Sequence, residues 1–162
     1  MRRGVNAGKA RQEGPRWIGR WGVLVLALSV LVGPNVLGFV DDARSFALEG
    51  AYPYIESGFI LREDYWPGEL APGKKKIIRH QLFKGNEYWF WLATDADPDK
   101  KVVLSVHIYD ARGELAEAET ITFLQGSGAR ILPKNTGSYY IVVKVEKASA
   151  RKVAWALVYA YR

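Results

Sequence analysis

The chain of 162 residues contains no cysteine, which excludes disulfides, thiolate catalysis, Cys-ligated zinc and a lipid anchor on cysteine. Histidine is scarce as well: His80 and His107 lie on separate predicted strands and show no metal-ligand spacing. No G-x-S-x-G elbow is present, because Ser127 stands between two glycines in what reads as a flexible turn. These absences argue against an enzyme, and we expect a non-catalytic protein.

The positive charge of the chain is confined to its start. Residues 1–20 hold six basic residues and one acidic residue, whereas the rest of the chain holds 17 basic and 16 acidic residues. The folded part therefore lacks the basic footprint of a nucleic-acid-binding domain, and we expect no nucleic-acid partner. A basic flank beside an apolar run is typical of the cytoplasmic side of a membrane segment.

That apolar run covers residues 21–40 and contains no charged side chain. Twenty helical residues extend about 30 Å, enough to cross the hydrocarbon core of a bilayer. Trp17 and Trp21 flank Arg20, as expected at the headgroup level. We predict an uncleaved signal-anchor that leaves the C-terminal domain in the periplasm or outside the cell. The alternative is a signal peptide cleaved near Gly38, with secretion of the domain.

The remainder of the chain predicts an all-β fold, a single jelly-roll-like β-sandwich of about seven or eight strands behind the N-terminal hydrophobic helix. We expect residues 41–73 to be a linker with a short helix that ends at Gly50, and residues 74–162 to form the sandwich. Hydrophobic alternation with a period of two predicts seven strands, at residues 76–83, 87–94, 102–109, 117–123, 129–132, 138–145 and 152–161.

Three segments between His80 and Val145 resemble the bacterial pre-peptidase C-terminal domain, a jelly-roll module of secreted proteins. They are the glycine turn and aromatic strand of residues 83–90, the Tyr-Asp-x-x-Gly turn within residues 106–113, and the Gly-x-Tyr strand of residues 136–143. The resemblance implies a non-catalytic accessory module that supports binding, anchoring or stability. In the turn, Gly113 supplies a conformation that other residues resist, and Asp110 is expected to bond the backbone.

Aromatic residues make up 13% of the chain, more than a small core needs. In the strand of residues 87–94 we predict that Tyr88 and Phe90 point into the core, while Trp89 and Trp91 lie on an exposed outer face. Truncating Trp91 should then leave stability nearly unchanged. The candidate binding residues are Trp89, Trp91, Tyr65, Trp66 and Tyr140.

Three aspartates alternate along the loop of residues 94–100, namely Asp95, Asp97 and Asp99. Calcium prefers several oxygen ligands, and such a loop can bring them to one ion. The loop is therefore a candidate calcium site. The alternative is a solvated turn without any cofactor, since aspartate is common in turns.

Together these features predict an exported, membrane-tethered interaction module without catalytic activity. It binds a protein partner in the periplasm or at the cell surface through an exposed aromatic face. The alternative is a carbohydrate-binding module, because flat aromatic faces also stack on sugar rings.

Overall fold

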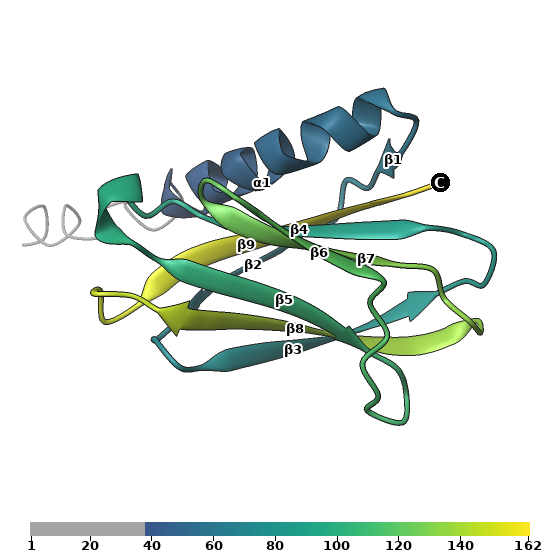
Figure 1. The fold of residues 1–162 in the computed structure, drawn as a ribbon. Helices are drawn as coiled ribbons and strands as arrows, with labels where there is room; N and C mark the ends of the chain where they lie inside the picture. The colour runs from purple at the N-terminus through teal and green to yellow at the C-terminus, as the bar shows by residue number, and fades with distance from the viewer. Residues whose placement is uncertain (1–37) are drawn as a thin grey trace, which may run out of the picture. The chain divides into compact units, whose positions relative to one another are not determined.

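Alternating strands of the chain build two antiparallel sheets that pack face to face as a β-sandwich (Figure 1). The structure is a computed structural model, and it describes residues 38–162. The elements are α1 (Gly38–Glu56), β1 (Ile60–Leu61), β2 (Trp66–Leu70), β3 (Lys75–Leu82), β4 (Tyr88–Thr94), the 3₁₀ turn η1 (Pro98–Lys100), β5 (Val103–Tyr109), β6 (Glu119–Phe123), β7 (Gly126–Ile131), β8 (Gly137–Lys147) and β9 (Val153–Tyr161).

The larger sheet has the order β1–β9–β4–β7–β6, and β2 pairs with β9 on the same edge as β1. The smaller sheet has the order β3–β8–β5. The core between the sheets comes from the alternate residues of the facing strands. Tyr88, Phe90 and Leu92 of β4 all point into it, which confirms the predicted inner face of this strand.

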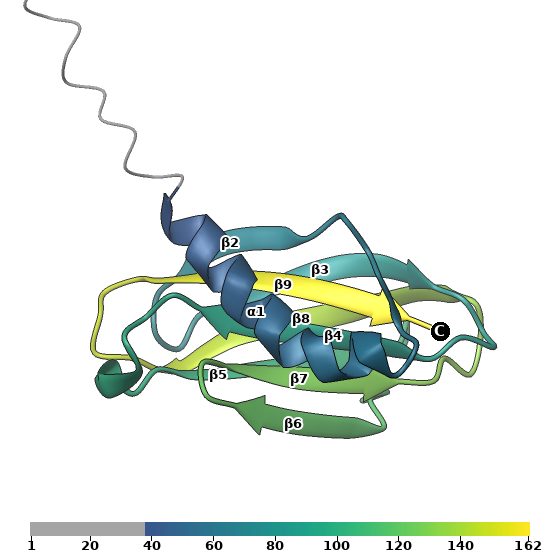
Figure 2. The same ribbon diagram turned by 90° about the horizontal axis from the view of Figure 1, so that it is seen from above.

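Helix α1 covers the outer face of the larger sheet and gives the domain a third layer (Figure 2). Ala43, Ala47 and Ala51 recur every four residues and are fully buried, because small side chains let the helix lie close to the sheet. The sequence predicts that the helix ends at Gly50, but the helix continues to Glu56. A Cβ on Gly50 would lie 2.7 Å from the ring of Phe123, so this glycine serves close packing inside the helix.

The predicted linker of residues 41–73 therefore belongs to the sandwich, which corrects the boundary placed at residue 74. Its helix ends at Glu56, where Gly58 takes a positive φ of 100° and its amide N donates to the Ile55 carbonyl at 3.0 Å. The short strands β1 and β2 then pair with β9, the strand that ends the chain. The sequence around β1 and β2 shows only turn residues, and their partner strand β9 lies almost a hundred residues away, so this pairing was not predicted.

Residues 126–128 also differ from their prediction, since they form the start of β7 and not a turn. Gly126 lies so close to β4 that a Cβ would be 2.1 Å from the carbonyl oxygen of Leu92. The glycines of this segment are therefore selected by close approach of two strands. The connection between β6 and β7 is instead Leu124-Gln125.

The predicted basic segment of residues 1–20 lies outside the described residues, as do residues 21–37 of the predicted membrane segment. Within residues 38–162, no helix has both the length and the apolar character needed to span a bilayer.

Candidate functional site

The predicted tryptophan face is covered. Trp89 and Trp91 point away from the inter-sheet core, as predicted, but they are only 2% and 0% exposed. Tyr54 of α1 lies over both indole rings, with centroids 4.6 Å from Trp89 and 5.3 Å from Trp91. The prediction that these tryptophans are exposed is therefore wrong, because α1 folds back over the sheet and forms a second core with them.

Of the other predicted binding aromatics, Tyr65 packs against the core that holds Trp89 and Trp91, whereas Trp66 and Tyr140 lie elsewhere. Tyr65 is half-buried, with the guanidinium of Arg44 4.4 Å from its ring centroid. Trp66 packs against the inter-sheet core and meets the ring of His80 edge-on at 5.2 Å. Tyr140 lies on the outer face of the smaller sheet. The five residues therefore form no common surface.

The acidic loop brings no cluster of candidate ligands together among residues 38–162. The Oδ1 atom of Asp97 accepts a 3.0 Å hydrogen bond from the amide of Asp99, so it caps the short turn η1. Asp95 is half-buried, and this burial raises the pKa of its carboxyl. The observed geometry is that of an Asx turn.

The two histidines lie on opposite faces of the smaller sheet. His80 points inward among Trp66, Phe90 and Tyr159, and burial lowers its pKa. His107 points outward, and its Nδ1 lies 2.8 Å from Oε1 of Glu117. The two imidazoles therefore cannot act on one substrate or bind one metal ion.

Large apolar side chains are exposed at the end of the sandwich where β3, β5 and β7 finish, which we call the loop end. They are Phe83 from the β3–β4 connection, Leu115 from the β5–β6 loop and Leu132 from the β7–β8 loop, and they are 52%, 61% and 54% exposed. In Figure 1 these three loops lie at the end of the sandwich where β9 and the chain also end. Apolar groups that three separate loops hold in water are typical of an interaction surface.

The loop end contains a hollow of about 670 Å³ between the β5–β6 and β7–β8 loops. Apolar side chains from both loops meet there, since Leu115 and Leu132 both line it. Arg112, Lys134 and Asn135 supply polar groups around them. This mixture of apolar surface and a few polar groups suits the anchor side chains of a partner.

Hydrogen bonds hold the β5–β6 loop in one conformation. The Oδ1 atom of Asp110 accepts bonds from the amides of Arg112 (2.8 Å) and Glu114 (3.0 Å), and Gly113 takes a positive φ of 79°. These bonds confirm the role expected of Asp110 in the turn. The bond from the Glu114 amide is the main cause of the lowered pKa of Asp110.

The other loops are tied to each other. The amide of Lys84 donates to Oγ1 of Thr136 at 3.0 Å and joins the β3–β4 hairpin to the β7–β8 loop. The hydroxyl of Tyr139 donates to the Asn135 carbonyl at 3.0 Å. A surface that is ordered before binding loses less entropy when a partner arrives.

The sequence matches no known family model and no curated protein.

The loop end was not predicted from the sequence, because its exposed apolar side chains lie in loops and not in the aromatic strands. A signal was nonetheless present: Phe83, Leu115 and Leu132 are large apolar residues beside the turn residues Gly85, Gly113 and Pro133. In the structure Phe83 and Leu132 each lie one residue beyond the end of a strand, so neither belongs to an alternating face of a sheet.

Proposed function

We propose that this protein is a tethered, non-catalytic β-sandwich module that binds a protein partner through its loop end. The observation that carries the proposal is the exposure of three large apolar side chains at one end of the sandwich, Phe83, Leu115 and Leu132, of which Leu115 and Leu132 line one hollow. Exposed apolar anchors that cluster on a rigid base are characteristic of protein–protein interfaces.

The direction of the polypeptide supports this choice of surface. Helix α1 begins at the end of the sandwich opposite the loop end and runs toward it (Figures 1 and 2). The loop end therefore lies at the end of the domain farthest from the point where the chain enters α1.

The strand order supports a jelly roll as the finer description of the fold. Strands β2, β3, β4 and β5 alternate between the two sheets, and β8 and β9 close the smaller and the larger sheet against them. This alternation is what two interlocked Greek keys produce. A jelly roll also agrees with the resemblance to pre-peptidase C-terminal domains, which implies an accessory module.

Site-specific cross-linking in intact cells tests the proposed surface. A photoreactive phenylalanine analogue replaces Leu132, and in the matched control it replaces Leu124, which is 86% exposed in the β6–β7 turn at the opposite end. We expect a discrete adduct with another protein from position 132 and none from position 124. Equal adducts from both positions, or none from position 132, would contradict the proposal.

The charged variant Leu115→Asp provides a second test in the same cells. Because Leu115 is 61% exposed, the change should leave the thermal midpoint within about 2 °C and should abolish the adduct from position 132. Leu124→Asp should preserve the adduct. An adduct that survives Leu115→Asp would show that the loop end is not the interface.

A further inference from the structure

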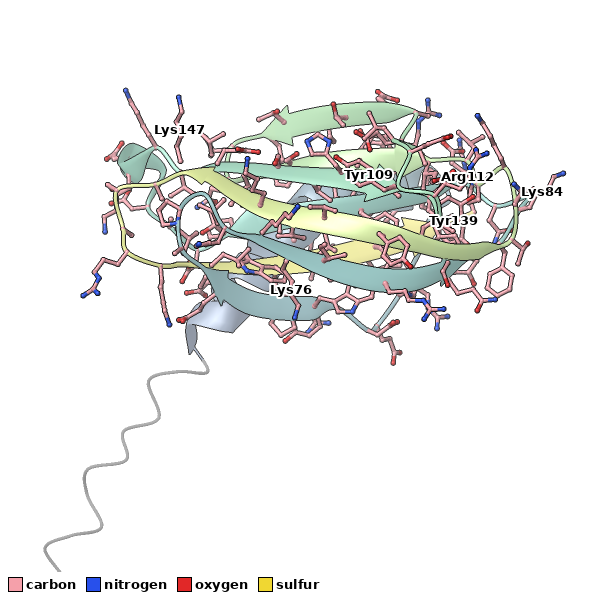
Figure 3. All side chains as sticks on the ribbon, turned by 90° about the horizontal axis from the view of Figure 1, so that it is seen from below. Lys76, Lys84, Tyr109, Arg112, Tyr139 and Lys147 are labelled. Atoms are coloured by element: carbon pink, nitrogen blue, oxygen red, sulfur yellow. The ribbon has the colours of Figure 1, made fainter. Side chains whose placement is uncertain are left out.

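Within residues 38–162 the outer face of the smaller sheet carries no helix, unlike the outer face of the larger sheet beneath α1 (Figure 3). We call it the open sheet face. Strands β3, β8 and β5 each present alternate residues on it, and the pairing register aligns them in rows across the three strands. The rows are Arg79–Tyr140–Tyr109, Ile77–Val142–His107 and Lys75–Lys144–Ser105.

Two cations of this face, Lys75 and Arg79, are exposed and form no ion pair with residues 38–162. Lys75 also stands directly opposite Lys144 in the antiparallel pairing. Like charges at opposed positions destabilise a sheet, and the nearby carboxylate of Glu146 pairs with Lys144 alone. The face therefore keeps a local excess of positive charge that an anionic ligand would neutralise.

Two tyrosines lie side by side next to these cations. Tyr140 is opposite Arg79 on one side and Tyr109 on the other, so the three side chains cross the sheet in one row. Both rings are partly exposed. In the next row Ile77 is 50% exposed, which extends the apolar surface beside the rings. The result is a nearly flat aromatic and aliphatic surface with cations along its β3 side.

A shallow hollow of about 680 Å³ lies on the same face. Lys74, Lys75 and Lys144 line it together with His107, Tyr109 and one carboxylate, that of Glu146, which is paired with Lys144. A ligand in this hollow would meet several ammonium groups and one phenol ring within a single binding site. Charge-assisted bonds from ammonium groups to carboxylate or sulfate are stronger than bonds between neutral groups.

We propose that the open sheet face binds an anionic polysaccharide. The apolar faces of the sugar rings lie on Tyr109 and Tyr140, and the carboxylate or sulfate groups meet Lys75, Arg79 and the lysines of the hollow. Tyrosine rings and aliphatic side chains interspersed with cations across the sheet favour a chain of sugar rings over insertion into a lipid bilayer, which requires a continuous apolar face. This site is distinct from the loop end, so the two proposals can fail separately.

Binding of the full chain in non-ionic detergent to immobilised polygalacturonate tests the proposal, with neutral dextran as the control polymer. We expect binding to polygalacturonate alone. The variant Lys75→Gln/Arg79→Gln should weaken it about tenfold. The matched variant Lys84→Gln/Lys134→Gln removes the same charge from the loop end and should change the affinity less than about twofold. The basic residues 1–20 are the same in both variants, so their contribution cancels in the comparison.

The variant Tyr140→Leu separates sugar stacking from general attraction between charges. It keeps an apolar side chain on the face but removes the flat ring, and we expect it to weaken binding to polygalacturonate about tenfold. An unchanged affinity of Tyr140→Leu, or equal losses in the two double variants, would overturn the proposal. So would equally tight binding of phosphatidylglycerol vesicles with no dependence on Tyr140, because the ligand would then be a lipid surface. Far-UV circular dichroism melts of each variant identify any loss that comes from unfolding.

Discussion

The second core beneath α1 makes Trp91 as important for stability as Phe90, although the two side chains point to opposite faces of β4. Both side chains are fully buried, at 0% exposure. We therefore predict that Trp91→Ala and Phe90→Ala each lower the free energy of unfolding by about 3–5 kcal/mol. The sequence alone favours the opposite result for Trp91, because it gives no sign of a covering helix.

The magnitude for Trp91 comes from packing alone. Its indole Nε1 is buried and has no hydrogen-bond partner among residues 38–162, so truncation removes no hydrogen bond within this part of the chain. The variant Trp91→Phe should consequently cost much less, about 1 kcal/mol, since it keeps most of the apolar contact and removes an unpaired N–H group. Against a total stability of about 5–15 kcal/mol, the difference between the two variants is large.

A double-mutant cycle assigns the effect to the helix. Tyr54 of α1 lies 5.3 Å from Trp91, between ring centroids, with the rings inclined by 52°. An aromatic pair of this kind contributes about 0.5–1.5 kcal/mol beyond the burial of its area. We expect Tyr54→Ala and Trp91→Ala to show a coupling energy in that range.

Urea unfolding of the full chain, followed by far-UV circular dichroism, measures all of these values without dependence on tryptophan fluorescence. Leu124→Ala is the control for a large apolar residue of the same sheet region that is 86% exposed, and it should change stability by less than about 0.5 kcal/mol. A Trp91→Ala variant as stable as this control, or a coupling energy near zero, would refute the docking of α1 on the tryptophans.

Two further predictions concern a glycine and a histidine. Gly126→Ala should prevent stable folding, because its Cβ would lie 2.1 Å from a backbone oxygen, whereas Gly137→Ala, with nothing within 4 Å of its Cβ, should be tolerated; thermal melts compare the two. Burial lowers the pKa of His80 below its ordinary value, so its neutral form is favoured in the folded state. Stability should fall as pH drops below about 6.5, the range where unfolded histidine gains a proton, and His80→Gln should reduce that fall.

Most of the strands were predictable from the sequence because their residues follow a period of two; the exceptions are β1, β2 and the start of β7. Strand β4 was predicted at residues 87–94 and spans Tyr88–Thr94, and β9 was predicted at residues 152–161 and spans Val153–Tyr161. Turn glycines explain the sharp boundaries: Gly85 and Gly113 take positive φ values of 99° and 79°, which disfavour continuation of a strand. The positions of these two strands and of the turns at Gly85 and Gly113 therefore follow from local sequence.

The cover on the larger sheet was not predictable in the same way, because it depends on contacts distant in sequence. Strand β4 is apolar on both faces, and such a strand is either covered twice or exposed as a binding surface. The sequence of β4 itself is the same in both cases, so it does not show whether a distant helix covers the second face. The stripe of Ala43, Ala47 and Ala51 was the missing signal, since small residues at helical spacing opposite bulky tryptophans indicate close helix packing.

The position of α1 implies that the domain exposes the same surfaces whether the N-terminal apolar segment is kept as an anchor or cleaved. Cleavage near Gly38 would remove the apolar segment but retain Ala43, Ala47 and Ala51, the residues that α1 buries against the sheet. The tryptophans therefore stay covered whether the domain is tethered or released. Because the loop end and the open sheet face lie on other elements, a secreted form and an anchored form should bind the same ligands. Tethering would then change the effective concentration of the module at the membrane and leave its intrinsic affinities unchanged.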